Sequence, residues 1–260
     1  MRRRGFLRAA LLLSLAALVS AQNRGGAPPL PPRAAAPFDM SGYWVSQIVD
    51  EWRFRVDPQK GDILYLPLNA AARRAANAWD PANDEAEGNA CKAYGAVGVM
   101  QRPGRLHITW ENDTTLRIDT DAGTQTRLLH FGPAPALPGP PSRQGYSTAV
   151  WQFSARAMLD LGGVGFVPGG GPDQRRGGTL RVTTSQMLPG YLRKNGVPYG
   201  DHAVLTEYFN RLTGAQGEAY LVVTAMLDDP AYLTQPFVRT YTFQQRPDAS
   251  GWDPTPCWPR

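Results

Sequence analysis

Alternation of apolar and polar residues is the feature that most constrains how this chain can fold. In the stretch RLHITWE at 105–111, Leu106, Ile108 and Trp110 fall on one face of an extended chain and the residues between them on the other. The stretch TLRIDTD at 115–121 alternates in the same way, and the polar residues between the two stretches are typical of a turn. The pattern therefore predicts a β-hairpin with one face buried.

Strands of this kind recur along the rest of the chain. Nine are expected, at 42–56, 105–111, 115–121, 124–131, 146–153, 178–187, 204–212, 219–227 and 237–244. Many strands in sequence with mostly short turns favour a barrel or a sandwich, and closing a barrel removes the exposed edges of an open sheet. We therefore expect an all-β fold, a single antiparallel β-barrel of about nine strands.

Helix signals are few. Residues 69–78 contain good helix formers, and residues 84–93 follow start signals at Asp80, Pro81 and Asn83. We expect one or two short helices beside the barrel.

The chain opens like an export signal. The basic residues of this opening segment are Arg2, Arg3, Arg4 and Arg8. Residues 9–19 form an apolar run too short to span a bilayer, and residues 19–21 resemble a small-residue cleavage site. These features predict a signal peptide at 1–21 and a periplasmic or secreted protein. The pair Arg3-Arg4 before Phe6-Leu7 also matches the twin-arginine pattern, with an ordinary basic signal as the alternative.

Composition after the predicted signal indicates a tether followed by one domain. Residues 22–37 are rich in Pro, Gly and Ala and predict an extended tether, which leaves 38–260 as the barrel domain. The whole chain has 27 basic and 22 acidic residues, and removing the four bases of the signal leaves 23 against 22. We therefore expect no nucleic-acid partner. Since no second apolar stretch reaches spanning length, we expect no membrane insertion of the mature chain.

The two cysteines, Cys91 and Cys257, are expected to form one disulfide in an exported protein, with two free thiols as the alternative. They lack the close spacing of zinc ligands, and the three histidines form no local metal motif. The Gly-rich stretch 160–178 lacks the glycine spacing and context of a dinucleotide site, so we expect a surface loop or lid there. The sequence predicts no metal and no cofactor.

One acidic residue falls on an apolar strand face. In VLTEYFNRL, Glu207 shares its face with Leu205 and Phe209, so its carboxylate is expected to be buried. A buried carboxylate needs a partner or a raised pKa, and the candidate partners are Arg211, Arg239 and Tyr241. A structural ion pair is the alternative to a functional role.

The expected first strand carries a step, Gly42-Tyr43-Trp44, that is similar to the G-x-W motif of lipocalins. A wider resemblance covers most of the mature chain and points to a family of uncharacterised exported bacterial β proteins that start with Asp-x-Ser-Gly-x-Trp. The motifs that carry it are Asp39–Trp44, Cys91, Pro103–Ile108, Ile118–Asp121, Gly145–Ser147, Leu205–Phe209 and Asp228–Pro230. The resemblance implies a lipocalin-like fold and export, and it transfers no catalytic residue.

These observations predict a barrel that binds a small apolar or aromatic ligand in its lumen. The predicted ligand-binding residues are Trp44, Trp110, Glu207, Arg239 and Tyr241. One alternative is a cofactor-free isomerase, lyase or hydratase that uses a buried Glu, Tyr or His as acid and base. Another is an envelope interaction protein that uses the Pro-rich stretch 133–141 and the Gly-rich stretch 160–178 as contact surfaces. The expected partner is a small molecule, and no catalytic residue is assigned.

Overall fold

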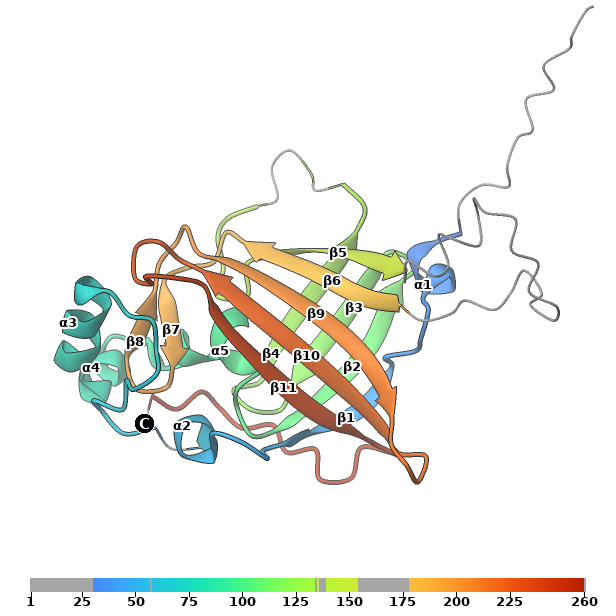
Figure 1. Cartoon of the computed structure of the whole chain (residues 1–260), viewed down its shortest axis with the longest axis horizontal. Coiled ribbons are helices and arrows are strands. Elements are labelled where there is room, and N and C mark those ends of the chain that lie inside the picture. The colour runs from blue at the N-terminus through green and yellow to red at the C-terminus, as the bar shows by residue number, and fades with distance from the viewer. Residues whose placement is uncertain (1–29, 57, 134, 136–138, 154–177, 260) are drawn as a thin grey trace, which may run out of the picture.

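The predicted nine-stranded barrel is present and closed. The computed structural model describes residues 30–259 except 57, 134, 136–138 and 154–177. The barrel strands are β1 (Gly42–Gln47), β2 (Arg105–Asn112), β3 (Thr115–Thr120), β4 (Gln125–Phe131), β5 (Tyr146–Phe153), β6 (Gly178–Ser185), β9 (Val204–Thr213), β10 (Ala219–Asp228) and β11 (Phe237–Arg246). Around the barrel they follow the order β1-β11-β10-β9-β6-β5-β4-β3-β2, and β2 pairs with β1 to close it (Figure 1).

One strand pair departs from the antiparallel arrangement that we expected. The strands β2, β3 and β4 are antiparallel, but β5 lies parallel to β4, with Leu129 opposite Ser147. A parallel neighbour requires a connection that returns to the starting end of the sheet, and the connection between β4 and β5 lies partly outside the described residues. The barrel is therefore mixed, and all of its other neighbouring strands pair antiparallel.

The described chain contains more helices than expected. They are α1 (Pro32–Ala35), α2 (Trp52–Val56), α3 (Ala70–Ala78), α4 (Pro81–Ala86), the 3-10 helix η1 (Ala90–Tyr94) and α5 (Ala96–Val99). The predicted helix at 69–78 is confirmed as α3, whose Asn69 side chain accepts a hydrogen bond from the Ala72 amide. In place of the second helix, predicted at 84–93, the structure has two shorter helices, α4 and η1. The Asp80 side chain caps α4 and Pro81 is its first residue.

Three segments differ from the sequence prediction. The strand expected at 42–56 ends at Gln47, and its last five residues form α2. Part of the segment expected to be an extended tether forms α1. A small hairpin of β7 (Gly190–Arg193) and β8 (Val197–Tyr199) was not predicted, because strands this short show too little alternation.

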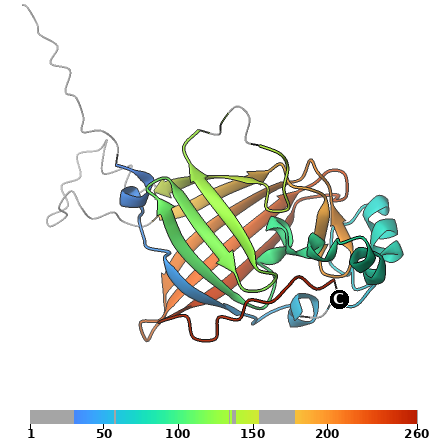
Figure 2. The same cartoon turned by 180° about the vertical axis from the view of Figure 1, so that it is seen from behind.

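The two ends of the barrel are covered by different elements. Helices α2 to α5 and the β7-β8 hairpin gather at one end, which we call the helical end, and α1 lies at the other, the α1 end (Figures 1 and 2). The C-terminal tail runs back along the barrel to the helical end (Figure 1). There the predicted disulfide is confirmed, since Cys257 of the tail is bonded to Cys91 of η1.

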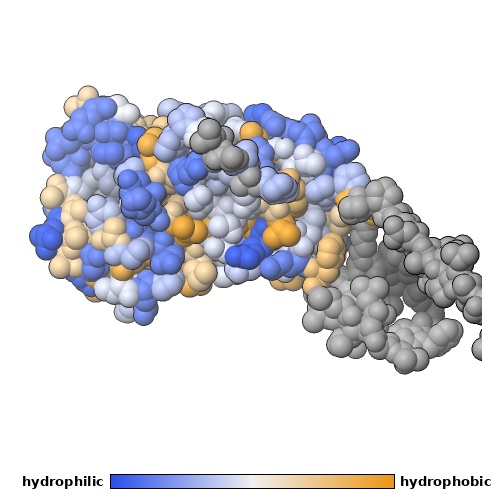
Figure 3. Space-filling model, turned by 90° about the horizontal axis from the view of Figure 1, so that it is seen from above, coloured by the Kyte–Doolittle hydropathy of each residue, from blue (hydrophilic) through white to orange (hydrophobic). Residues whose placement is uncertain are grey.

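Side chains from every barrel strand fill the interior. Fully buried residues include Trp44 on β1, Ile108 on β2, Ile118 on β3 and Phe209 on β9, and they belong to one hydrophobic cluster. On the face in Figure 3, apolar residues are scattered among polar ones rather than gathered in one patch. None of the helices in the described residues has the length and apolar character needed to cross a membrane.

Candidate functional site

The acidic residue singled out by the sequence lies inside the barrel in a two-pronged ion pair. Glu207 on β9 is fully buried, and its Oε1 and Oε2 accept hydrogen bonds from Arg127 Nη1 at 3.1 Å and Arg127 Nη2 at 2.6 Å. Arg127 Nη2 also donates to Thr184 Oγ1, which is 2.8 Å from Ser147 Oγ. Both carboxylate oxygens are thus occupied by one guanidinium, the arrangement of a structural pair.

The partner of Glu207 is not one of the three predicted residues. Arg211 is exposed, Arg239 pairs with another carboxylate, and Tyr241 lies nearby without a hydrogen bond to Glu207. Arg127 was missed, although the sequence carried a signal for it. In TQTRLLHF it shares an inward face with Leu129, so an arginine on that face marks a buried charge.

The structure places Trp44 in the barrel core. Its side chain is fully buried, and its indole Nε1 donates to the Met40 carbonyl at 2.8 Å. With its one polar group satisfied by the backbone, Trp44 serves packing at the start of β1.

Aromatic rings gather at the α1 end of the barrel. Trp110 on β2 lies 5.4 Å from Phe131 on β4, measured between ring centroids, and Phe131 lies 5.6 Å from Trp151 on β5. Phe38, from the segment before β1, meets Trp151 edge-on at 5.4 Å. We call these four residues the aromatic cluster. The end of the barrel is therefore lined with flat apolar surfaces.

The segment around α1 is anchored over this end by two hydrogen bonds. The Trp151 indole Nε1 donates to the Pro32 carbonyl at 2.9 Å, and the Arg33 amide donates to the Asp113 carbonyl in the β2-β3 turn at 3.1 Å. These bonds hold α1 against this end of the barrel, beside the aromatic cluster.

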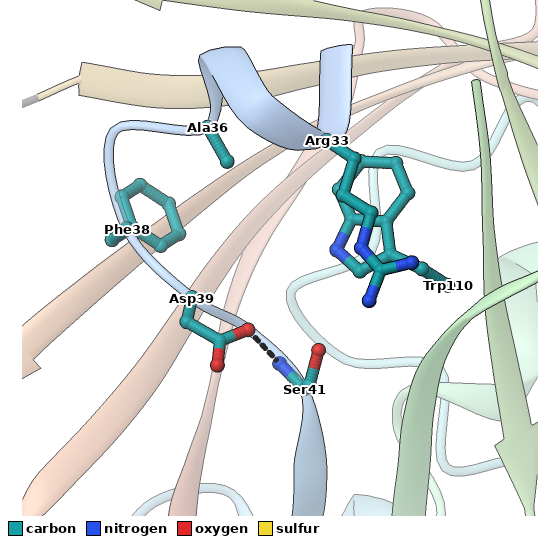
Figure 4. Close-up of a pocket in the computed structure, with 6 residues that line it drawn as sticks. All are labelled: Arg33, Ala36, Phe38, Asp39, Ser41 and Trp110. Atoms are coloured by element: carbon teal, nitrogen blue, oxygen red, sulfur yellow. Dashed lines mark hydrogen bonds between the residues drawn. The ribbon is translucent and has the colours of Figure 1, made fainter. Parts of the chain in front are cut away.

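A pocket of about 300 Å³ lies between this segment and the barrel. Its lining consists of Arg33, Ala36, Phe38, Asp39, Ser41 and Trp110. Figure 4 shows Trp110 and Arg33 on one side of it and Phe38 on the other, with the Asp39 carboxylate accepting from the Ser41 amide at 2.8 Å. The pocket thus combines apolar walls with one cationic and one anionic side chain, so it suits a small molecule with an apolar body and a polar edge.

The remaining predicted residues lie at the opposite end. Ala225 on β10 is opposite both Glu207 and Arg239, and Tyr241 follows two residues later on β11. Arg239 Nε lies 2.8 Å from Glu51 Oε2. Tyr241 is buried, and burial raises its pKa. The structure therefore brings Glu207, Arg239 and Tyr241 together toward the helical end and places Trp110 at the α1 end.

Other expectations fall partly outside the described residues. Residues 160–177 of the Gly-rich stretch lie outside them, as do 134 and 136–138 of the Pro-rich stretch. Among the residues that are described, no group of three or more His, Cys, Asp or Glu side chains is placed to hold a metal ion.

Comparison with known proteins yields no match to a family model, to a curated protein or to a solved structure. The family resemblance drawn from the sequence motifs therefore stays a prediction.

Proposed function

We propose that this protein is an exported barrel that binds a small molecule with an apolar or aromatic body at the α1 end. The observation that carries the proposal is the pocket between residues 31–41 and the barrel, with Trp110 and Phe38 in its walls. Its volume of about 300 Å³ falls at the small end of the range for ligand sites. The ligand is therefore a small ring system or a short chain.

The chemistry of the walls supports this assignment. The rings of Trp110 and Phe38 offer apolar contact, and Phe131 and Trp151 support them from behind. Arg33 and Asp39 provide one donor and one acceptor group that orient a ligand with a polar edge.

Binding is a better account of this pocket than acid-base catalysis. The enzymatic alternative relied on a buried Glu, Tyr or His, and none of the six lining residues is of these types. Glu207, the strongest acidic candidate, lies elsewhere and is bound at both oxygens by Arg127.

The proposal of export is supported by the signal-like start of the chain and by the disulfide. Disulfides persist in oxidising compartments such as the periplasm, and Cys91 is bonded to Cys257. We propose the twin-arginine route. Replacing Arg3 and Arg4 by Lys should leave an unprocessed precursor in the cytoplasm of the expressing bacterium. Undiminished export of that variant, measured by fractionation and immunoblotting, would assign the protein to the general secretory route.

Titration with Nile red, a neutral apolar dye that fluoresces in apolar surroundings, tests the ligand site. The unmodified protein should bind the dye. Trp110→Ala should weaken binding about tenfold, since losing one aromatic contact of about 1.4 kcal/mol corresponds to that factor. Trp258→Ala is the matched control, because Trp258 is 52% exposed and lies in the tail at the helical end. Equal affinity for both variants would contradict the proposed site.

A further inference from the structure

Four arginines converge at the helical end, away from the proposed ligand pocket. They are Arg55 on α2, Arg102 after α5, Arg193 on β7 and Arg239 on β11, and we call them the arginine cluster. Arg55, Arg102 and Arg193 are only 4%, 6% and 1% exposed. Arginine is almost never buried unless it is paired, so this burial calls for a partner.

The cluster is arranged around the buried ring of Tyr241. The guanidinium of Arg55 lies 5.4 Å from the centre of that ring. Electrostatic interactions link Tyr241 to Arg55, Arg193 and Arg239, and link Arg102 to both Tyr241 and Arg55. All four arginines therefore interact with Tyr241.

The described carboxylates do not balance this charge. The Glu51 carboxylate lies near two of these arginines, with its Oε2 2.8 Å from Arg239 Nε and 3.9 Å from Arg193 Nη2. Asp50 lies 3.8 Å from Arg55 Nη1, but its side chain is 61% exposed. Glu207 belongs to Arg127, outside the cluster.

Arg102 is the least compensated member. Among the described residues no carboxylate lies within 4 Å of its guanidinium, and its buried Nε has no hydrogen-bond partner. Arg55 Nη2 and Arg193 Nη1 are likewise buried without a partner in the described structure. Arg239 Nε is close enough to Glu51 for an ion pair but not aligned for a hydrogen bond. Leaving such donors unpaired away from water is unfavourable.

Burial also affects the ionisation of these groups. It lowers the pKa of Arg55 and Arg193, and it lowers that of Arg102 to about 10. A pKa of about 10 leaves Arg102 positively charged at neutral pH, so an anion is its complementary ligand.

We propose that the arginine cluster is a second binding site, which takes the oxyanion of a small molecule, a carboxylate or a phosphate. Guanidinium groups bind both through paired N–H donors. The Glu51 carboxylate already stands between Arg193 and Arg239, and it marks where one oxyanion fits. The bound oxyanion displaces Glu51 and accepts hydrogen bonds from the unpaired nitrogens of Arg193 and Arg239.

The position of Glu51 fits an exchangeable counter-ion. Its side chain is 27% exposed, as is that of Arg239, so the site reaches the surface here. Its backbone φ of 47° lies in the left-handed region, which is unfavourable for a residue other than glycine. The Glu51 carbonyl accepts hydrogen bonds from the Phe54 and Arg55 amides, so its backbone is held in place while its side chain can be exchanged for an anion.

Calorimetric titration of the full chain with inorganic phosphate and with benzoate, at constant ionic strength, tests the proposal. We expect at least one of the two to bind with one site per chain, and the one that binds identifies the oxyanion. Glu51→Gln should bind it several-fold tighter, because the internal competitor loses its charge. Failure of both probes to bind the unmodified protein and Glu51→Gln would overturn the proposal.

Two further variants separate this site from the α1-end pocket and from a purely structural role. Arg102→Met should weaken anion binding several-fold without lowering the thermal midpoint of the anion-free protein, since it removes a buried charge that has no counter-ion among the described residues. A lowered midpoint with anion binding intact would overturn the assignment of Arg102. Arg33→Met, in the α1-end pocket, should leave anion binding unchanged, and loss of binding there would overturn the location. Nile red binding on the same variants reports the proposed function independently.

Discussion

Glu207 and Arg127 show how two buried charges are tolerated inside this barrel. Both side chains are excluded from water, and each satisfies the other through two hydrogen bonds. Removing one partner leaves the other charge buried and uncompensated, whereas removing both leaves an apolar site. Once one of these two charges is present in the interior, the other is therefore needed to compensate it.

We predict that Glu207→Gln destabilises the protein by about 3–5 kcal/mol, because Arg127 then keeps its charge without a counter-ion. Urea denaturation measures the change in the free energy of unfolding. Glu111→Gln is the control, since Glu111 pairs with Arg117 on the exposed surface at 3.4 Å and such pairs contribute about 0–1 kcal/mol. The double variant Glu207→Leu/Arg127→Met should be more stable than Glu207→Gln. Equal losses for Glu207→Gln and Glu111→Gln would refute this account.

The sequence located the buried acid but not its partner, for a physical reason. Alternation tells which face of a strand is buried, and it correctly placed Glu207 inside. Arg127 lies on β4, separated from β9 by β5 and β6 in the barrel order. Contacts across a lumen depend on closure and register, which a local pattern does not contain.

At the scale of elements, Asp84 joins the helices to the β7-β8 hairpin. Its buried carboxylate accepts hydrogen bonds from Trp79 Nε1 at 2.8 Å, from Lys92 Nζ at 3.0 Å and from the Tyr191 hydroxyl at 3.0 Å. One side chain of α4 thus connects the end of α3, η1 and β7.

Asp84→Ala should destabilise the protein by roughly 1.5–3 kcal/mol, because three donors lose a charged acceptor. Glu85→Ala on the same helix is exposed and should change stability by less than about 0.5 kcal/mol. Thermal unfolding of both variants gives the comparison. If Asp84→Ala were as stable as Glu85→Ala, the hairpin would be held by its apolar contacts alone.

Strong local patterns were enough to predict some elements and not others. The long alternating strands were expected because each contains enough residues to show its period, and α3 was expected because it consists of good helix formers. The hairpin at 190–199 was not expected, since its strands are four and three residues long. The strand predicted at 42–56 was too long because its apolar residues continue past Gln47, while the left-handed backbone at Glu51 turns the chain into α2.

At the scale of the whole molecule, the barrel separates two ends of different chemistry. The α1 end holds the aromatic cluster and its pocket, and the helical end holds the arginine cluster and the disulfide. The disulfide closes a loop of 166 residues, which in the chain-entropy argument stabilises the fold by about 5 kcal/mol. It fastens the tail and η1 at the helical end.

The candidate site could be predicted only in part. The expectation of an apolar or aromatic ligand in the barrel drew attention to Trp110, which lines the pocket. Phe38, Arg33 and Asp39 were not expected there, because they lie beside or within a segment whose composition suggested a tether. The hydrogen bond between Trp151 and the Pro32 carbonyl of α1 brings this segment to the barrel. Because the two residues lie far apart in the sequence, no local sequence pattern predicts this bond.

The most direct test of the central claim is the nuclear magnetic resonance of the seven tryptophan indole N–H groups during titration with Nile red. Each indole gives its own signal, so the experiment locates the ligand on the intact barrel. We predict that the signals of Trp110 and Trp151 shift as the dye binds, while those of Trp79 and Trp258 at the helical end stay in place. A Trp110 signal that does not move at saturating dye would contradict a ligand site at the α1 end.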